Sequence, residues 1–207
     1  MYIPRHNEET RIEVLDRLMR SQPLASLVTI GSSGLFATHL PMVLHRTDEK
    51  HAILRGHLSR ANRQWSEFSP EVQALAIFAG PQHYITPGWY PEKVGTGKVV
   101  PTWNYAVVHA YGTLRILEDA DWLLTHLNTL TDTHEATQPA PWSVNDAPAD
   151  LLKGIVGIEL SVERLEGKWK VSQNQTDHTR ASVADGLEAL GTEDSLAMRD
   201  LVEGKHP

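Results

Sequence analysis

The sequence predicts an α+β fold in which a small antiparallel β-barrel is flanked by helices. Its β-rich segments follow one another as hairpins rather than as strand–helix–strand units. Helical periodicity recurs near both ends of the chain. Of the 207 residues, 41% are apolar and 22% are charged, which is enough apolar material for a core. We therefore expect one domain over residues 1–207, with a helical C-terminal extension from about residue 178.

The first part of the chain is predicted to alternate short helices with strands. Residues 7–20 predict an amphipathic helix capped by Asn7, because two glutamates and then apolar residues at helical spacing follow it. Residues 24–31 and 34–44 predict a hairpin joined by Ser-Ser-Gly, with Pro41 marking an edge or a bulge. The other elements expected here are strands at 51–58 and 72–79 and a short helix at 60–68.

The second part begins with a long segment, residues 80–101, whose proline, glycine and aromatic content predicts an ordered functional loop. A strand at 103–117 is followed by a helix from Asp119 to His134, with Asp119 as its N-cap. The apolar stripe of that helix predicts that four leucines face inward, at positions 123, 124, 127 and 130. The remaining expected elements are a surface loop at 137–148, a strand at 155–165 that ends in a turn at 166–167, its continuation at 168–175, and two C-terminal helices.

Charge and composition exclude several classes of function. The net charge of −7 and the scattered basic residues give little support for duplex DNA as a partner. The absence of cysteine excludes disulfides, thiolate metal sites and cysteine nucleophiles. No apolar stretch approaches the length of a membrane span, and we expect a cytoplasmic protein.

A candidate anion site lies in the window from Arg55 to Trp65. His57 ends a predicted strand, Ser59 stands at the predicted helix N-cap, and Arg60 and Asn62 fall in the first turn. A hydroxyl, a guanidinium and unpaired backbone N–H groups would then converge, as a phosphate requires. An ordinary capped helix with a solvated Arg60 explains the same spacing.

Aromatic and amide residues crowd a second region, at 82–90 and 100–105. Their rings offer stacking area and Asn104 offers an amide, which suits a flat heterocycle that forms hydrogen bonds. Rings that cover a barrel end or a subunit interface would have the same composition.

The eleven histidines do not have the spacing of a zinc site, and no metal is expected. His126 and His134 are predicted to be surface residues of one helix. His83 and His109, which are flanked by aromatics, could ligate haem or could form hydrogen bonds within their own segments.

Four ordered segments resemble the signatures of a known family: GHLSRANRQW, GPQHYITPGWY, VPTWNYAVVHAYG and LEGKWKVSQNQ. They are similar to the PaiB-like family of FMN-binding negative transcriptional regulators, part of the split-barrel superfamily of pyridoxamine-phosphate oxidases and haem-utilisation proteins. The similarity runs from Met1 to about Leu190. It implies an antiparallel split β-barrel, FMN as cofactor, and a homodimer with the flavin at the subunit interface.

The resemblance also implies which residues bind the cofactor. The phosphate would lie at the strand-to-helix junction and the isoalloxazine ring beside a strand, with an amide and late residues completing the site. One departure is Ala61, where many superfamily oxidases carry a lysine. The residues implied are Thr38, His39, Leu40, His57, Ser59, Arg60, Asn62, Trp103, Asn104, Lys170 and Gln173.

Three functions remain open from the sequence. The first is a regulatory or sensory flavoprotein, for which direct DNA contact would need a basic patch built from both subunits. The second is a flavin-dependent oxidoreductase that acts on a small molecule or takes electrons from a small-molecule reductant, with Lys170 near the flavin ring and His83 and Tyr84 facing the substrate. The third is a haem-binding protein.

Overall fold

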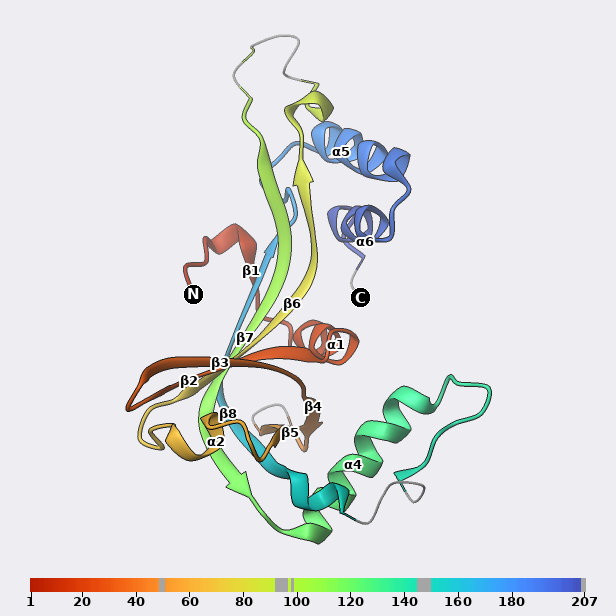
Figure 1. Cartoon of the computed structure of the whole chain (residues 1–207). Coiled ribbons are helices and arrows are strands. Elements are labelled where there is room, and N and C mark those ends of the chain that lie inside the picture. Colours follow the sequence, from red (N-terminus) through yellow and green to blue (C-terminus); the bar gives the residue numbers. More distant parts are fainter. Residues whose placement is uncertain (49–50, 92–96, 98, 145–149, 206–207) are drawn as a thin grey trace. The chain divides into compact units, whose positions relative to one another are not determined.

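The computed structural model describes residues 1–48, 51–91, 97, 99–144 and 150–205. The strands are β1 (Glu8–Glu9), β2 (Leu24–Gly31), β3 (Gly34–Pro41), β4 (Val43–Arg46), β5 (Ala52–Ser59), β6 (Ala74–Ile85), β7 (Thr102–Leu117) and β8 (Ile155–Lys170). The α-helices are α1 (Ile12–Ser21), α2 (Gln64–Glu67), α4 (Ala120–Glu135), α5 (Asp177–Leu190) and α6 (Glu193–Val202) (Figure 1). Short 3₁₀ helices occur at Arg5–Asn7, Pro87–Trp89 and Leu151–Gly154.

Hydrogen bonds connect the strands in the order β3-β2-β6-β7-β8-β5-β4, and β1 pairs with β8. The chain forms two compact units, one of residues 1–22, 78–109 and 166–207, and one of residues 23–77 and 110–165. We call them the terminal unit and the central unit. β6, β7 and β8 contribute residues to both. The predicted α+β class with antiparallel strands is confirmed.

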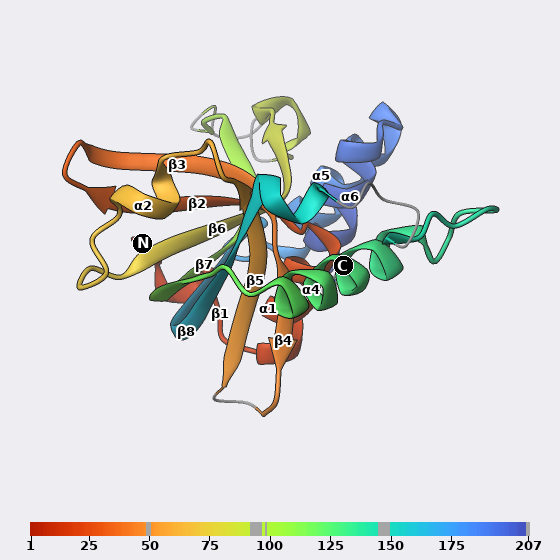
Figure 2. The same cartoon turned by 60° about the horizontal axis from the view of Figure 1, so that its bottom comes forward.

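In the central unit, β5 separates a core face from a polar face. Ala52, Leu54 and Leu58 alternate along β5 and are buried in the core. Arg55 and His57 alternate with these positions and point the other way, and α4 packs against β5 (Figure 2). β5 pairs with β8 so that His57 lies opposite Gly157. A Cβ atom on Gly157 would stand 2.2 Å from the Trp122 ring, so only glycine lets α4 pack this closely.

Two predictions for the central unit are wrong in detail. The strand expected at 34–44 is broken after Pro41, so that β3 and β4 stand at opposite ends of the strand order. Pro41 does mark an edge, as predicted, since β3 is a terminal strand. The helix expected at 60–68 is only the four residues of α2, and Ser59 is the last residue of β5 rather than an N-cap.

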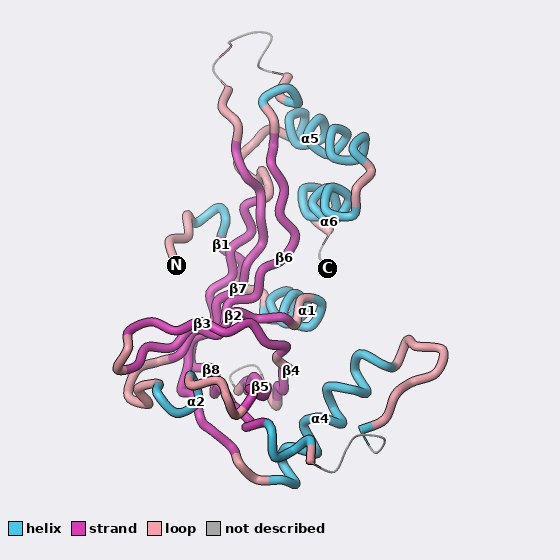
Figure 3. The backbone as a smooth tube through the Cα atoms, viewed as in Figure 1, coloured by secondary structure: helices cyan, strands magenta, loops and turns pink. Residues whose placement is uncertain are grey.

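In the terminal unit, glycines mark where backbones approach closely. β8 does not end in a turn at 166–167, as the sequence led us to expect, but continues to Lys170. Gly167 pairs with Glu9 of β1, and a Cβ there would stand 2.6 Å from the Glu9 carbonyl oxygen. α5 and α6 lie side by side as the two expected C-terminal helices (Figure 3). Within this unit, Gly186 of α5 faces the Trp89 ring.

The remaining differences concern helix ends and loops. Asn7 belongs to a 3₁₀ turn, and α1 begins only at Ile12, without a side-chain cap. The segment at 80–101 is less irregular than expected, because β6 extends to Ile85; residues 92–96 and 98, like 145–149 of the later loop, lie outside the described residues. Asp119 caps α4 as predicted, but Leu124 is 39% exposed.

Candidate functional site

The turn between β5 and α2 is built by side chains that cap its backbone. The Ser59 Oγ accepts from the Ala61 N–H at 3.3 Å, and the Asn62 N–H donates to the Ser59 carbonyl at 2.9 Å. The Asn62 Oδ1 accepts from the N–H of Gln64, the first residue of α2, at 3.0 Å. The N-cap position of α2 is Arg63, which makes no capping bond of its own, and the Asn62 amide instead satisfies the first N–H of the helix.

Asn62 also joins this turn to the edge strand β3. Its Nδ2 donates to the Thr38 Oγ1 at 2.9 Å, and both residues are half-buried. Next to Thr38, His39 is exposed and its Nδ1 lies 2.9 Å from the Ser26 Oγ, whereas Leu40 is buried. Two sequence segments that were predicted to bind the same ligand thus meet through a direct hydrogen bond.

The guanidinium of Arg60 is engaged within the chain. It donates to the Glu118 carboxylate at 2.6 Å and to the carbonyl oxygens of Lys153 at 3.2 Å and Ile155 at 3.3 Å. Trp65 lies beside it, with its ring centroid 5.8 Å from the guanidinium carbon. The side chains of Arg60 and Glu118 are 38% and 57% exposed, so solvent and ions can reach this pair.

His57 meets a histidine that the sequence had placed on the surface. His126 is only 2% exposed, and its Nε2 lies 3.2 Å from the His57 Nδ1. The Trp122 ring stacks on His126 at a centroid distance of 5.3 Å. The surface prediction is therefore wrong for His126, while His134 is exposed as predicted. His126 stands three residues after the buried Leu123 and one before the buried Leu127, which places it on the inner stripe of α4. This spacing is the sequence signal from which its burial could have been predicted.

Burial keeps both histidines neutral. It lowers the pKa of His57, and it lowers the pKa of His126 to about 4, with further contributions from the nearby charges of His57, His45 and Arg55. Neutral imidazoles remain able to donate one hydrogen bond and accept another.

A buried carboxylate lies next to these histidines. Glu159 is 4% exposed and accepts from Arg55 at 2.8 Å, Arg115 at 2.7 Å and the indole N–H of Trp122 at 3.3 Å. Burial raises the pKa of Glu159, but the hydrogen bonds from Arg115 and Arg55 outweigh it and the net shift is downward. No sequence pattern pointed to Glu159, because its partners Arg55, Arg115 and Trp122 lie far from it in the chain.

The other predicted site residues belong to the terminal unit. Lys170 donates through Nζ to the Trp103 carbonyl at 2.9 Å and to the Thr102 hydroxyl. Asn104 is 1% exposed and donates to the Ser172 Oγ at 2.9 Å. Gln173 bonds to nearby backbone, accepting from the Val171 N–H at 2.8 Å and donating to the Trp169 carbonyl.

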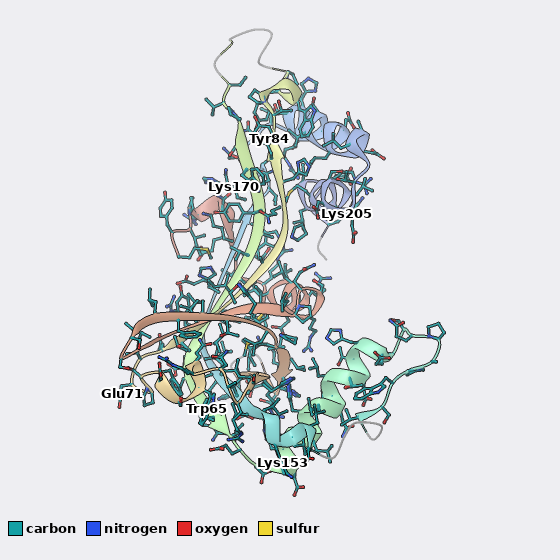
Figure 4. All side chains as sticks on the ribbon, in the orientation of Figure 1. Trp65, Glu71, Tyr84, Lys153, Lys170 and Lys205 are labelled. Atoms are coloured by element: carbon teal, nitrogen blue, oxygen red, sulfur yellow. The ribbon has the colours of Figure 1, made fainter. Side chains whose placement is uncertain are left out.

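Exposed aromatic rings lie near Lys170 within the terminal unit, where Figure 4 labels Lys170 and Tyr84. Tyr84 and Trp103 are 43% and 50% exposed, and their ring centroids lie 6.1 Å apart. His83 bonds through Nδ1 to the Tyr84 carbonyl at 2.7 Å and stacks on Trp89. Among the described residues, no cluster of three or more His, Asp or Glu side chains has the geometry of a metal site.

The β5–α2 turn and β3 fit FMN in chemistry. β3 is the terminal strand of the sheet order, so one backbone edge carries no strand of the described chain and can bond to the polar edge of a flat ring. The turn brings the hydroxyl of Ser59, the guanidinium of Arg60 and the imidazole of His57 to one strand end. Such donors suit a phosphate dianion.

No helix in the described part of the chain has the length and apolarity that crossing a bilayer requires.

Comparisons with known proteins show the family to which this chain belongs. A family model described as "Putative FMN-binding domain" matches residues 1–164. The protease synthase and sporulation protein PAI 2 of Bacillus subtilis is 31% identical over 99% of this chain and 98% of its own. An uncharacterised protein of Emericella nidulans is 35% identical over 98% of this chain and 96% of its own.

A solved structure confirms the fold class. The flavocytochrome Anf3 from Azotobacter vinelandii superimposes with a TM-score of 0.59 at 13% identity, covering 81% of this chain and 72% of that one. At this identity the likeness shows the fold alone, and it agrees with the predicted split barrel. With the family match and the full-length relative, it confirms the resemblance that the four sequence segments carried: the chain belongs to the PaiB-like family of FMN-binding domains.

Proposed function

We propose that this protein is a regulatory or sensory flavoprotein that holds the FMN phosphate at the β5–α2 turn and the ring along β3. The observation that carries the proposal is the hydrogen bond from Asn62 to Thr38, which joins the phosphate-binding turn to the edge strand. Bound FMN would supply a redox centre, while the protein supplies binding, orientation and electrostatics.

Arg60 would bind the phosphate in place of the Glu118 carboxylate, its partner within the chain. Its present partner, Glu118, is more than half exposed, and an exposed ion pair contributes only about 0 to 1 kcal/mol. A phosphate dianion offers a stronger, charge-assisted bond in the same geometry. Glu118 therefore competes with the phosphate for Arg60 and moderates the affinity for FMN.

The homodimer is proposed on the apolar surface of the β2–β3 hairpin. A soluble monomer rarely exposes several large apolar side chains on one hairpin, and a second copy of the chain would cover them. The flavin would then lie beside the interface, because β3 belongs to both features. The exposed residues on one face of the hairpin are Leu24 (64%), Ile30 (40%) and Leu35 (79%).

Regulation through the flavin suits the charge of the chain better than direct DNA contact, since a net charge of −7 repels a duplex. A flavin-dependent oxidoreductase is the second candidate, and the position of Lys170 favours it. The Lys170 ammonium lies 2.9 Å from the Trp103 carbonyl, beside the exposed rings of Trp103 and Tyr84, where a planar small molecule could stack.

A pair of substitutions tests the phosphate site. Arg60→Ala should weaken FMN binding by about tenfold or more, and Glu118→Gln should strengthen it severalfold, because Arg60 is then free of its carboxylate. Isothermal titration with FMN and with riboflavin, which has no phosphate, gives the control: neither substitution should change riboflavin affinity. Equal FMN affinity in the wild type and both variants would refute the phosphate assignment.

Two further measurements test the dimer and the type of flavoprotein. Leu35→Glu should shift the sedimentation coefficient from dimer to monomer, and a wild-type monomer would refute the interface. Anaerobic mixing with NADPH or NADH separates the two candidates: rapid bleaching of the flavin favours the oxidoreductase, and no bleaching favours the sensor. A Soret band in the purified protein would instead support a haem-binding protein.

A further inference from the structure

The hydrogen bond between His57 and His126 contains a single proton. Its position decides whether the other ring nitrogen of His57, Nε2, donates or accepts a hydrogen bond. The His57 Nδ1 and the His126 Nε2 lie 3.2 Å apart, and the two rings meet edge to face with centroids 5.4 Å apart. When both rings are neutral, one of these nitrogens carries the proton and the other accepts it. If His57 Nδ1 carries the proton, the other ring nitrogen of His57, Nε2, is a bare acceptor. A phosphate repels such an acceptor. If His126 Nε2 carries it, the outer nitrogen of His57 is an N–H donor.

The opposite nitrogen of His126 decides between the two arrangements. Its Nδ1 is buried and has no hydrogen-bond partner among the described residues. A buried N–H without an acceptor is rarer in proteins than a buried acceptor without a donor. The proton of His126 therefore belongs on Nε2, where it has a partner, and not on Nδ1, where it has none.

We infer that His126 donates its Nε2–H to His57 and thereby holds His57 as the neutral Nε2–H tautomer, which presents an N–H donor to the phosphate of FMN. The phosphate contact rests on the proposed function; the tautomer does not. His126 is a positioning residue, since it acts on the ligand only through His57. An outer hydrogen bond that fixes the tautomer of a ligand-binding histidine is a general device in proteins.

The surroundings keep both rings in this state. Trp122 stacks on His126, and Gly157, opposite His57 on β8, leaves room for the Trp122 ring. Among the described residues, His45 of β4 and Arg55 of β5 act on the charge of His126, and Glu159 of β8, which contacts the same Trp122, is satisfied by its two arginines and that indole. The positive charge of Arg55 opposes protonation of His126, in agreement with the lowered pKa of that ring.

Nitrogen NMR of the wild-type protein tests the tautomer without any variant. Long-range proton–nitrogen spectra of ¹⁵N-labelled protein at neutral pH distinguish a protonated ring nitrogen from a bare one. We expect a protonated Nε2 and a bare Nδ1 in both His57 and His126. A protonated Nδ1 on His57 would overturn the inference, whatever the protein binds.

Two substitutions test the positioning role. His126→Gln keeps an N–H donor at a similar reach, whereas His126→Leu removes it. We expect the leucine variant to lose between about twofold and tenfold in FMN affinity, because a hydrogen bond between two neutral rings no longer holds the tautomer of His57, and the glutamine variant to restore most of it. Riboflavin affinity should be the same in both. Equal losses for FMN and riboflavin in the leucine variant would show that His126 only packs.

The variant His57→Ala separates the inference from the proposed function. If the phosphate contact exists, His57→Ala weakens FMN binding, and adding His126→Leu to it causes no further loss. If the spectra show the expected tautomers but His57→Ala leaves FMN affinity unchanged, the inferred tautomer of His57 is correct and its proposed contact with the phosphate is refuted.

Discussion

Acidification should destabilise the central unit through His126. The pKa of this ring is lowered from its usual 6.5 to about 4, chiefly by burial, so the folded protein binds the proton more weakly than the unfolded chain does. The stabilisation is fully present above about pH 6.5 and is lost progressively as the pH falls toward about 4. Relative to neutral pH, the loss of unfolding free energy is about 2 kcal/mol at pH 5 and about 3 kcal/mol at pH 4, at 1.36 kcal/mol for each pKa unit.

Urea denaturation at pH 7 and at pH 5, followed by tryptophan fluorescence, measures this loss. His126→Gln removes the titrating ring, and His134→Gln, on the exposed face of the same helix, is the matched control. Between pH 7 and pH 5, the wild type and His134→Gln should each lose about 2 kcal/mol more unfolding free energy than His126→Gln. The reasoning is refuted if His126→Gln loses as much stability as the wild type, because all other titrating groups are shared.

Three further predictions concern the packing of the central unit, and urea denaturation tests each of them. Gly112→Ala should lower the free energy of unfolding by about 2 to 3 kcal/mol, because its Cβ would stand 1.9 Å from the Ser161 carbonyl oxygen. Gly154→Ala, with open space around its Cβ, is the control and should lower it by less than about 1 kcal/mol. Equal losses for the two variants would contradict this prediction. Glu159→Gln should lower the free energy of unfolding by about 1 to 2 kcal/mol, because Arg55 and Arg115 lose a charged hydrogen-bond partner while both keep contact with solvent, and a neutral effect would show that solvent replaces it. Asp119→Ala should cost about 1 kcal/mol by removing the cap of α4, and unchanged stability would mean that α4 does not depend on its cap.

The local sequence determined most of the elements of this protein. The strand β5, the cap at Asp119 and the C-terminal helices follow from patterns within a few residues, and all three appear close to where they were predicted. The motif residues from His57 to Asn62 were also found at a strand end, because strand and turn propensities are local properties.

Only the tertiary structure decided what the candidate site residues contact. Gly167 has the composition of a turn, yet it stands inside β8, because the approach of β1 from another part of the chain requires a residue without a side chain. His126 is polar, yet it is buried, because α4 lies on a strand face that offers His57 as its hydrogen-bond partner. Both outcomes depend on pairs of residues distant in sequence, the histidines being 69 positions apart. No local pattern encodes such pairs, because only the folded chain brings them together.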